Sequence, residues 1–183
     1  SPSEIAILYR ANFQSRVLEE AFLVADIPYK VLGTRFFDRK EVKDMLSYVK
    51  VALNQKSEVD ITRTINTPLR GIGKVTVSKL FTQGRETLAG KAKEKVAAYY
   101  KIIEDISTAA QTQKASEVLL YTLERSGIKE ALTGGGEEEE ERLENIKELV
   151  SLCANRYDEL PAPDGLLRLI EDAALATDQD ELD

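Results

Sequence analysis

From residue 38 to residue 173 the apolar side chains recur three and four residues apart, in blocks separated by glycine and proline. The block Val42, Met45, Leu46 and Val49 shows this spacing clearly. Residues at these intervals share one face of an α-helix, so each block predicts a helix with one buried stripe. The larger part of the chain is therefore expected to be mainly α.

Several residues mark where these helices begin and end. Asp38 and Glu41 have the spacing of a capping box, Gly127 suits the position after a helix C-terminus, and the acidic run Glu137 to Glu141 suits a first helical turn. The helices are expected near residues 42–53, 58–65, 74–82, 92–106, 118–123, 137–153 and 166–173.

The first 33 residues have a different pattern. An apolar run at Ile5 to Tyr9 predicts a strand, Val17 to Ala25 a helix, and Tyr29 to Leu32 a second strand. This order is a βαβ signature. Because two strands do not form a stable parallel sheet alone, the segment is expected to be cut from a larger α/β domain.

Composition argues against several classes of protein. The chain has no histidine and one cysteine, which disfavours a zinc site, a disulfide and most general-base catalysis, so we expect neither catalytic nor metal-binding residues. Cys153 falls on an apolar stripe and is expected in the core. The apolar runs are too short to span a bilayer, and a cytoplasmic protein is the default expectation.

Charge is distributed unevenly along the chain. The formal net charge is −7, but residues 1–105 carry +5 and residues 106–183 carry −12. Within 63–101 there are nine basic and two acidic residues, which predicts either a polyanion-binding surface or an ordinary solvated lysine-rich face.

The stretch from Asn66 to Thr76, NTPLRGIGKVT, lies inside this basic window. Gly71 and Gly73 would permit a tight turn and a close approach of another molecule. A helix is expected to start directly afterwards, and its free amide groups suit a phosphate. Arg70 and Lys74 add charge, while Thr67 and Thr76 add hydroxyl donors. The alternative is an ordinary helix-entry turn; with its basic flanks, the pattern favours DNA-backbone binding.

A second candidate site follows the first expected strand. Arg10, Asn12, Gln14 and Arg16 would lie at the carboxyl end of that strand, where ligands bind in open α/β sheets. The alternative is a capped turn with a surface arginine, and the residues alone do not decide between the two.

Four segments in order resemble the UvrD/PcrA/Rep type of superfamily 1 DNA helicases. They are IAILYRANFQSRVLEEAF with IPYKVLGTRFFDRKEVKDMLSYVKV, INTPLRGIGKVT, RLENIKELV and LIEDAALATDQDELD. The resemblance implies that residues 1–33 are part of the second RecA-like motor domain, 2A, and residues 34–183 its helical insertion, 2B. It implies duplex contact through a GIG loop and single-strand contact through 2A. The duplex contacts would be Thr67, Arg70, Gly71, Ile72, Gly73, Lys74 and Thr76, and the single-strand contacts Arg10 and Asn12.

The same resemblance implies a parent protein that unwinds DNA with 3′→5′ polarity, in repair or replication, using ATP and Mg²⁺ and its remaining helicase domains. This chain has no Walker A loop, no acidic Mg²⁺ motif and no T-x-H-x-x-K-G-L-E segment. Because phosphoryl transfer needs these groups together, we expect no cofactor in this fragment and no catalysis by it alone.

Two other functions compete with a DNA-binding module. The acidic residues 137–175 could form a protein-interaction module for a repair or transcription partner. A free-standing enzyme is the least favoured, because no nucleophile or paired-carboxylate motif is recognisable.

Overall fold

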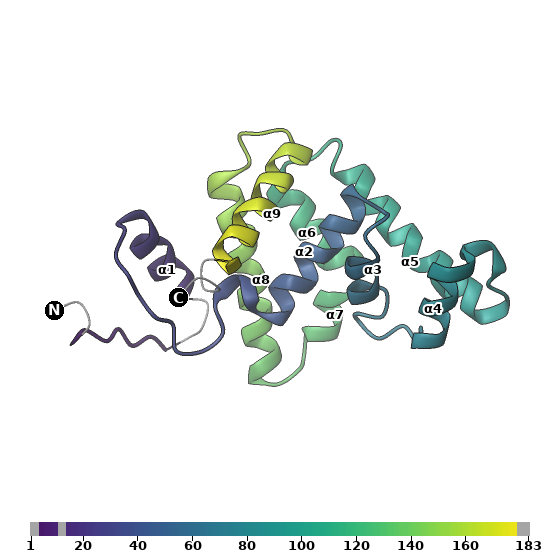
Figure 1. The fold of residues 1–183 in the computed structure, drawn as a ribbon, viewed down its shortest axis with the longest axis horizontal. Helices are drawn as coiled ribbons and strands as arrows, with labels where there is room; N and C mark the ends of the chain where they lie inside the picture. The colour runs from purple at the N-terminus through teal and green to yellow at the C-terminus, as the bar shows by residue number, and fades with distance from the viewer. Residues whose placement is uncertain (1–3, 11–13, 179–183) are drawn as a thin grey trace.

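The computed structural model describes residues 4–10 and 14–178, and within these ranges it contains helices and no strand (Figure 1). Two 3-10 turns, η3 (Phe36–Asp38) and η4 (Arg85–Thr87), precede α2 and α5. The mainly α fold predicted from the apolar spacing is confirmed. The helices are α1 (Ser15–Val24), α2 (Lys40–Leu53), α3 (Glu58–Thr64), α4 (Lys74–Gln83), α5 (Gly90–Ala109), α6 (Ala115–Arg125), α7 (Ile128–Leu132), α8 (Glu137–Arg156) and α9 (Ala162–Asp178).

α2 is the central helix, and α3, α5, α6, α8 and α9 all contact it. Because it is covered on most sides, its polar residues Glu41 and Asp44 are buried along with its apolar stripe and need hydrogen-bond partners. Asn145 of α8 donates to the Glu41 carboxylate at 2.6 Å, and Arg63 of α3 donates to Asp44 at 2.7 Å. These contacts fix α3 and α8 against the central helix.

α4 and the first turns of α5 project from this body, at the right-hand end of Figure 1. Leu80 is the buried residue of α4, and burial in α5 begins at Val96. Gly90 and the lysines that follow it therefore belong to an exposed part of the molecule. α1 lies at the opposite end of the view.

The predicted strands at residues 5–9 and 29–32 are not formed, although the helix between them is. Ile5, Leu8 and Leu32 are 73%, 94% and 88% exposed, so nothing in the described part of the chain covers them. A strand needs a neighbouring strand for its backbone hydrogen bonds, and two short segments separated by a helix do not supply a sheet. The βαβ arrangement is therefore not shown by the described residues, and the boundary between residues 33 and 34 remains a prediction.

The predicted helix ends are right in two places and wrong in one. α8 begins at Glu137, and Gly127 follows α6 in the left-handed conformation with φ +82°. Asp38 does not cap α2, however, because it ends η3 and α2 starts at Lys40. Glu41 reaches Asn145 instead of the backbone. The short helix α7 was not predicted, since one turn of helix carries little periodic signal.

Candidate nucleic-acid interface

The loop of residues 65–73 joins α3 to α4 and is built around one amide side chain. The Asn66 Oδ1 atom accepts hydrogen bonds from the backbone N–H of Arg70 at 2.8 Å and of Ile72 at 3.1 Å. Ile72 is 3% exposed and belongs to the core. The loop is therefore closed by Asn66 and anchored by Ile72, which leaves the residues on either side of Ile72 facing outward.

The two glycines of this loop differ in backbone conformation and in whether the fold requires a glycine. Gly71 has φ +67°, a left-handed conformation that other residues rarely adopt. Gly73 has φ −82° and ψ 166°, which any residue can adopt, and a Cβ atom added there would meet nothing within 4 Å. Since the fold does not require a glycine at position 73, its missing side chain leaves room for another molecule.

Free backbone donors gather at the start of α4. The first bonds inside the helix run from Thr76 and Val77 to the Gly73 carbonyl, at 3.0 and 3.2 Å. Within residues 4–10 and 14–178, no acceptor takes the amide N–H groups of Gly71, Gly73, Lys74 and Val75. Unsatisfied amides at the positive end of a helix dipole suit an anion such as a phosphate.

Arg70 points into the loop, and its guanidinium is engaged in internal hydrogen bonds. Its guanidinium donates to the backbone carbonyls of Thr64 at 3.1 Å, Thr67 at 3.1 Å and Ser126 at 2.6 Å. It also donates to the Tyr48 hydroxyl at 2.8 Å. A guanidinium shared among so many internal acceptors holds the loop in shape.

Two buried tyrosines complete this support. The Tyr48 hydroxyl donates to a carbonyl of the loop, and the Tyr99 hydroxyl lies 2.7 Å from the Thr64 Oγ1 atom. Burial raises the pKa of Tyr48 to about 12, although the nearby Arg70 opposes the shift, and burial also raises the pKa of Tyr99. Both phenols are therefore neutral near pH 7 and act as hydrogen-bonding groups inside the loop.

Most basic side chains of residues 63–101 have no ion-pair partner among the described residues and are free to bind an anion. Arg63 pairs with Asp44 and Lys101 with Asp105, and Arg85 lies over the Tyr100 ring with its guanidinium carbon 4.2 Å from the ring centroid. In the part of the chain that the structure describes, five exposed lysines make no ion pair: Lys74, Lys79, Lys91, Lys93 and Lys95. They lie on α4 and the first turns of α5, and Lys95 is the one whose side chain is seen to contact a described residue of the loop.

The remaining predicted duplex contacts differ in how far their side chains are exposed. Lys74 is exposed and Thr76 is half-buried on the first turn of α4. Thr67 is half-buried, and its carbonyl is already bonded by Tyr48 and Arg70. The buried Ile72 side chain is an anchor.

The sequence did not single out Leu69 in the loop and Val75 on the first turn of α4, whose side chains are 85% and 71% exposed. Val75 carries a weak signal in its position, because it precedes Val77 by two residues and so falls off the buried stripe of α4. For Leu69 no local signal separates an exposed leucine from a core one.

The second predicted site is only partly described. Arg10 is exposed, and its backbone N–H donates to the Gln14 side chain at 3.1 Å. Asn12 lies outside the described residues. Arg16 pairs with Glu148 of α8, so its guanidinium ties α1 to the helical body. This segment and the loop before α4 lie at opposite ends of the molecule (Figure 1).

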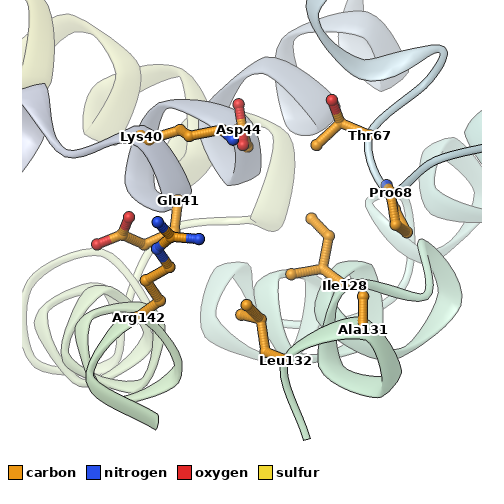
Figure 2. A pocket seen from close by; sticks show the side chains of 9 residues that line it. All are labelled: Lys40, Glu41, Asp44, Thr67, Pro68, Ile128, Ala131, Leu132 and Arg142. Carbon is orange, nitrogen blue, oxygen red and sulfur yellow. The ribbon is translucent and has the colours of Figure 1, made fainter. Parts of the chain in front are cut away.

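A small cavity of about 120 Å³ lies beside the loop, between α2, α7 and Pro68 (Figure 2). Ile128, Ala131 and Leu132 form its apolar side. Its charged residues, Lys40, Glu41, Asp44 and Arg142, are two cations and two carboxylates. Because these charges balance, the cavity adds no anion-binding character to the neighbouring loop.

The described residues form neither a membrane-spanning helix nor a cluster of metal-ligating side chains. None of their helices combines the length and apolarity needed to cross a bilayer. No group of three or more carboxylate and cysteine side chains among them could hold a metal ion. The predicted core position of Cys153 is confirmed, and burial raises the pKa of its thiol to about 12.

Residues 1–183 match the family described as the UvrD-like helicase C-terminal domain. The chain belongs to this family. It is similar to the ATP-dependent DNA helicase PcrA of Staphylococcus epidermidis, with 34% identity over 199 residues that cover 99% of this chain and 27% of the relative. The PcrA protein of Staphylococcus aureus is 32% identical over 198 residues, covering 98% of this chain and 27% of the relative.

Membership of the UvrD-like helicase C-terminal domain family confirms the resemblance at the level of UvrD-type and PcrA-type helicases. The chain spans about a quarter of the length of these curated relatives. The finer division into 2A and 2B segments remains a prediction.

Proposed function

We propose that this chain is the DNA-binding and regulatory 2B part of an ATP-dependent 3′→5′ DNA helicase of the UvrD/PcrA/Rep type. It holds the duplex backbone through the loop that precedes α4, while residues 1–33 belong to the 2A motor domain and Arg10 and Asn12 contact the single strand. The parent protein binds ATP and Mg²⁺ with its other domains and acts in the cytoplasm, in repair or replication. This fragment needs no cofactor.

The observation that carries this proposal is the set of four unoccupied amides at Gly71, Gly73, Lys74 and Val75. They lie at the start of a ten-residue helix, next to a glycine with open space around it and beside Lys74, an exposed lysine without an ion-pair partner among the described residues. Backbone amides and lysines bind phosphates and read no base sequence. Binding should therefore be independent of sequence and sensitive to salt.

Duplex affinity measured against salt concentration tests the proposal. A fluorescently labelled blunt duplex of mixed sequence is titrated with the 183-residue chain, its Lys74→Ala variant and the control Lys114→Ala. Lys114 is an exposed lysine just before α6, beyond the far end of α5, so its removal changes the net charge equally. We expect Lys74→Ala to lower the slope of log affinity against log salt by about 0.9, and Lys114→Ala to leave it unchanged.

Salt-independent binding, or equal slopes for all three proteins, would contradict the proposed role of the loop. A second duplex of scrambled sequence should bind with the same affinity. A preference for one sequence would mean that base edges are read, which the free amides do not do.

A second candidate function is protein binding by the acidic helices α8 and α9. Leu167 and Leu175 are 48% and 65% exposed on α9, whose sequence is rich in carboxylates. Exposed apolar residues among acidic ones suit a basic partner surface, such as that of a repair or transcription protein. Substituting Leu167 and Leu175 with serine should abolish capture of such a partner and leave duplex binding intact.

A further inference from the structure

We infer that Lys95 is a phosphate-binding residue of the same interface, supplied to the loop by α5. The inference rests on the proposed duplex contact and extends it to an element outside the loop motif. It also identifies Lys95 as a cation on the exposed side of the loop.

Lys95 reaches the loop directly. Its Nζ atom donates to the Gly71 carbonyl at 3.1 Å, although the two residues are 24 positions apart in the chain. A Cβ atom at position 71 would lie 2.5 Å from the same nitrogen. Gly71 therefore serves the site twice, since it permits the left-handed turn and leaves the space that the ammonium group occupies.

The charge of Lys95 has no counter-ion in the described part of the protein. Its partner is a neutral carbonyl, and no carboxylate pairs with it. An ammonium group has three donors, so the contact with Gly71 leaves two of them for solvent or a ligand. The cation lies beside the free Gly71 amide, whose neighbours Gly73 and Lys74 also have free amides. A phosphate oxygen is the ligand that satisfies both kinds of donor.

Arg70 and Lys95 thus contact the loop from different sides and have different roles in it. Arg70 binds the carbonyls of Thr64, Thr67 and Ser126 from inside the loop. Lys95 binds the Gly71 carbonyl from the exposed side. Because α5 carries Lys95, the distance between α4 and α5 becomes part of the geometry that a duplex meets.

Lys93 provides a matched control on the same helix. It is exposed, makes no ion pair with a described residue, and precedes Lys95 by two positions. Two positions correspond to about 200° around an α-helix, so the two side chains leave α5 on different faces. Lys93→Gln and Lys95→Gln remove the same charge from nearly the same place in the sequence.

The test measures binding of the 183-residue chain to a blunt duplex over a range of salt concentrations. We expect Lys95→Gln to weaken binding about fivefold to tenfold near 0.1 M monovalent salt and to lower the salt slope by about 0.9. Lys93→Gln should change affinity less than twofold, about the limit of such assays, with no change of slope. Lys95→Arg should restore most of the slope, and thermal midpoints should stay at the wild-type value, because Lys95 is exposed.

The outcomes separate the two proposals. If Lys74→Ala lowers the slope while Lys95→Gln behaves like Lys93→Gln, Lys95 is not a phosphate ligand and the duplex contact stands without it. Equal losses for Lys93→Gln and Lys95→Gln would mean general attraction to a basic surface, which also overturns the inference. If the wild-type chain shows no salt-dependent duplex binding, the proposed function itself fails.

Discussion

Gly73 and Arg70 lie three residues apart in the loop before α4, but their surroundings differ completely. Gly73 has empty space where a side chain would be, and the Arg70 guanidinium donates to five backbone carbonyls and a phenol. At the residue scale, substitutions at these positions should therefore separate DNA binding from stability.

Gly73→Ser should weaken duplex binding without weakening the fold. The position is the N-cap of α4 with extended backbone, where serine is at least as favourable as glycine. We expect the free energy of unfolding to stay the same or rise by a few tenths of a kcal/mol, about the glycine-to-serine difference at N-caps. Duplex affinity should fall, since the new side chain fills the approach to the free amides. A variant with lower stability and unchanged affinity would show that this glycine serves the fold.

Arg70→Lys should lower the stability of the fold and leave the salt dependence of duplex binding unchanged. A lysine keeps the charge but cannot reach several acceptors in one plane, so buried carbonyls lose their donors. We expect a loss of about 1–3 kcal/mol in the free energy of unfolding, measured by urea denaturation. The salt slope of duplex binding should not change, because no phosphate contact is removed. A slope lowered as in Lys74→Ala would show that Arg70 contacts DNA directly.

The raised pKa of Tyr48 predicts that the protein loses stability at alkaline pH. Its pKa is about 12 in the fold and 10.0 in the unfolded reference, so the folded protein holds this proton more tightly. The stabilisation is complete below pH 10 and is lost as pH rises from 10 towards 12, by at most about 2–3 kcal/mol. Urea denaturation at stepped pH should show this decrease, and it should be smaller in Tyr48→Phe. An identical decrease in both proteins would exclude Tyr48 as its source.

At the element scale, polar side chains link α1 to the helical body. Arg39 donates to Ser15 of α1 at 2.7 Å and to Asn145 of α8 at 2.8 Å. Burial lowers the pKa of Arg39, while Glu19 and Glu41 oppose that shift. Asn145 links Arg39 to Glu41, so this one amide satisfies two buried charged residues.

Asn145→Ala should therefore lower the free energy of unfolding more than the substitution of an exposed polar residue does. It leaves Arg39 and Glu41 buried with fewer partners, for which we expect a loss of about 2–4 kcal/mol in the free energy of unfolding. Limited proteolysis should also cut the segment between α1 and α2 faster, because Arg39 holds Ser15. The control is Lys147→Ala on the same helix, whose pair with Glu144 is exposed and should matter little. Equal effects of the two variants would show that the network is not structural.

The sequence predicted the long helices well, but it did not predict the contacts within the loop or the absence of strands among the described residues. The long helices followed from apolar spacing, because that spacing is a local property and one face of each helix is buried. The strands at 5–9 and 29–32 required partners that the described chain does not contain. Likewise, the inward direction of Arg70 depends on Tyr48 and Ser126, and the contact of Lys95 depends on α5, so neither could be derived from the motif alone.

At the scale of the whole molecule, the two predicted DNA sites lie at opposite ends of a helical body (Figure 1). α2 connects them, since it contacts α3 on one side and α8, which binds Arg16 of α1, on another. This arrangement suits a rigid spacer between a motor domain and a duplex, as proposed for a 2B part.

The chain alone is expected to hydrolyse no ATP, with or without DNA. It contains no Walker A loop and no acidic Mg²⁺ motif, and phosphoryl transfer needs both. Phosphate release measured with ATP, Mg²⁺ and either single-stranded or duplex DNA checks this expectation. Turnover that persists through purification would require a nucleotide site that the motifs do not reveal.

The most direct measurement is an NMR titration of the ¹⁵N-labelled 183-residue chain with a blunt DNA duplex, following each backbone amide. We predict that the largest shifts occur at Gly71, Gly73, Lys74 and Val75, whose N–H groups no described residue accepts. The amides of α8 and α9 should hardly move. Shifts concentrated on α8 and α9, or unchanged signals from residues 71–75 at saturating duplex, would contradict the proposed contact.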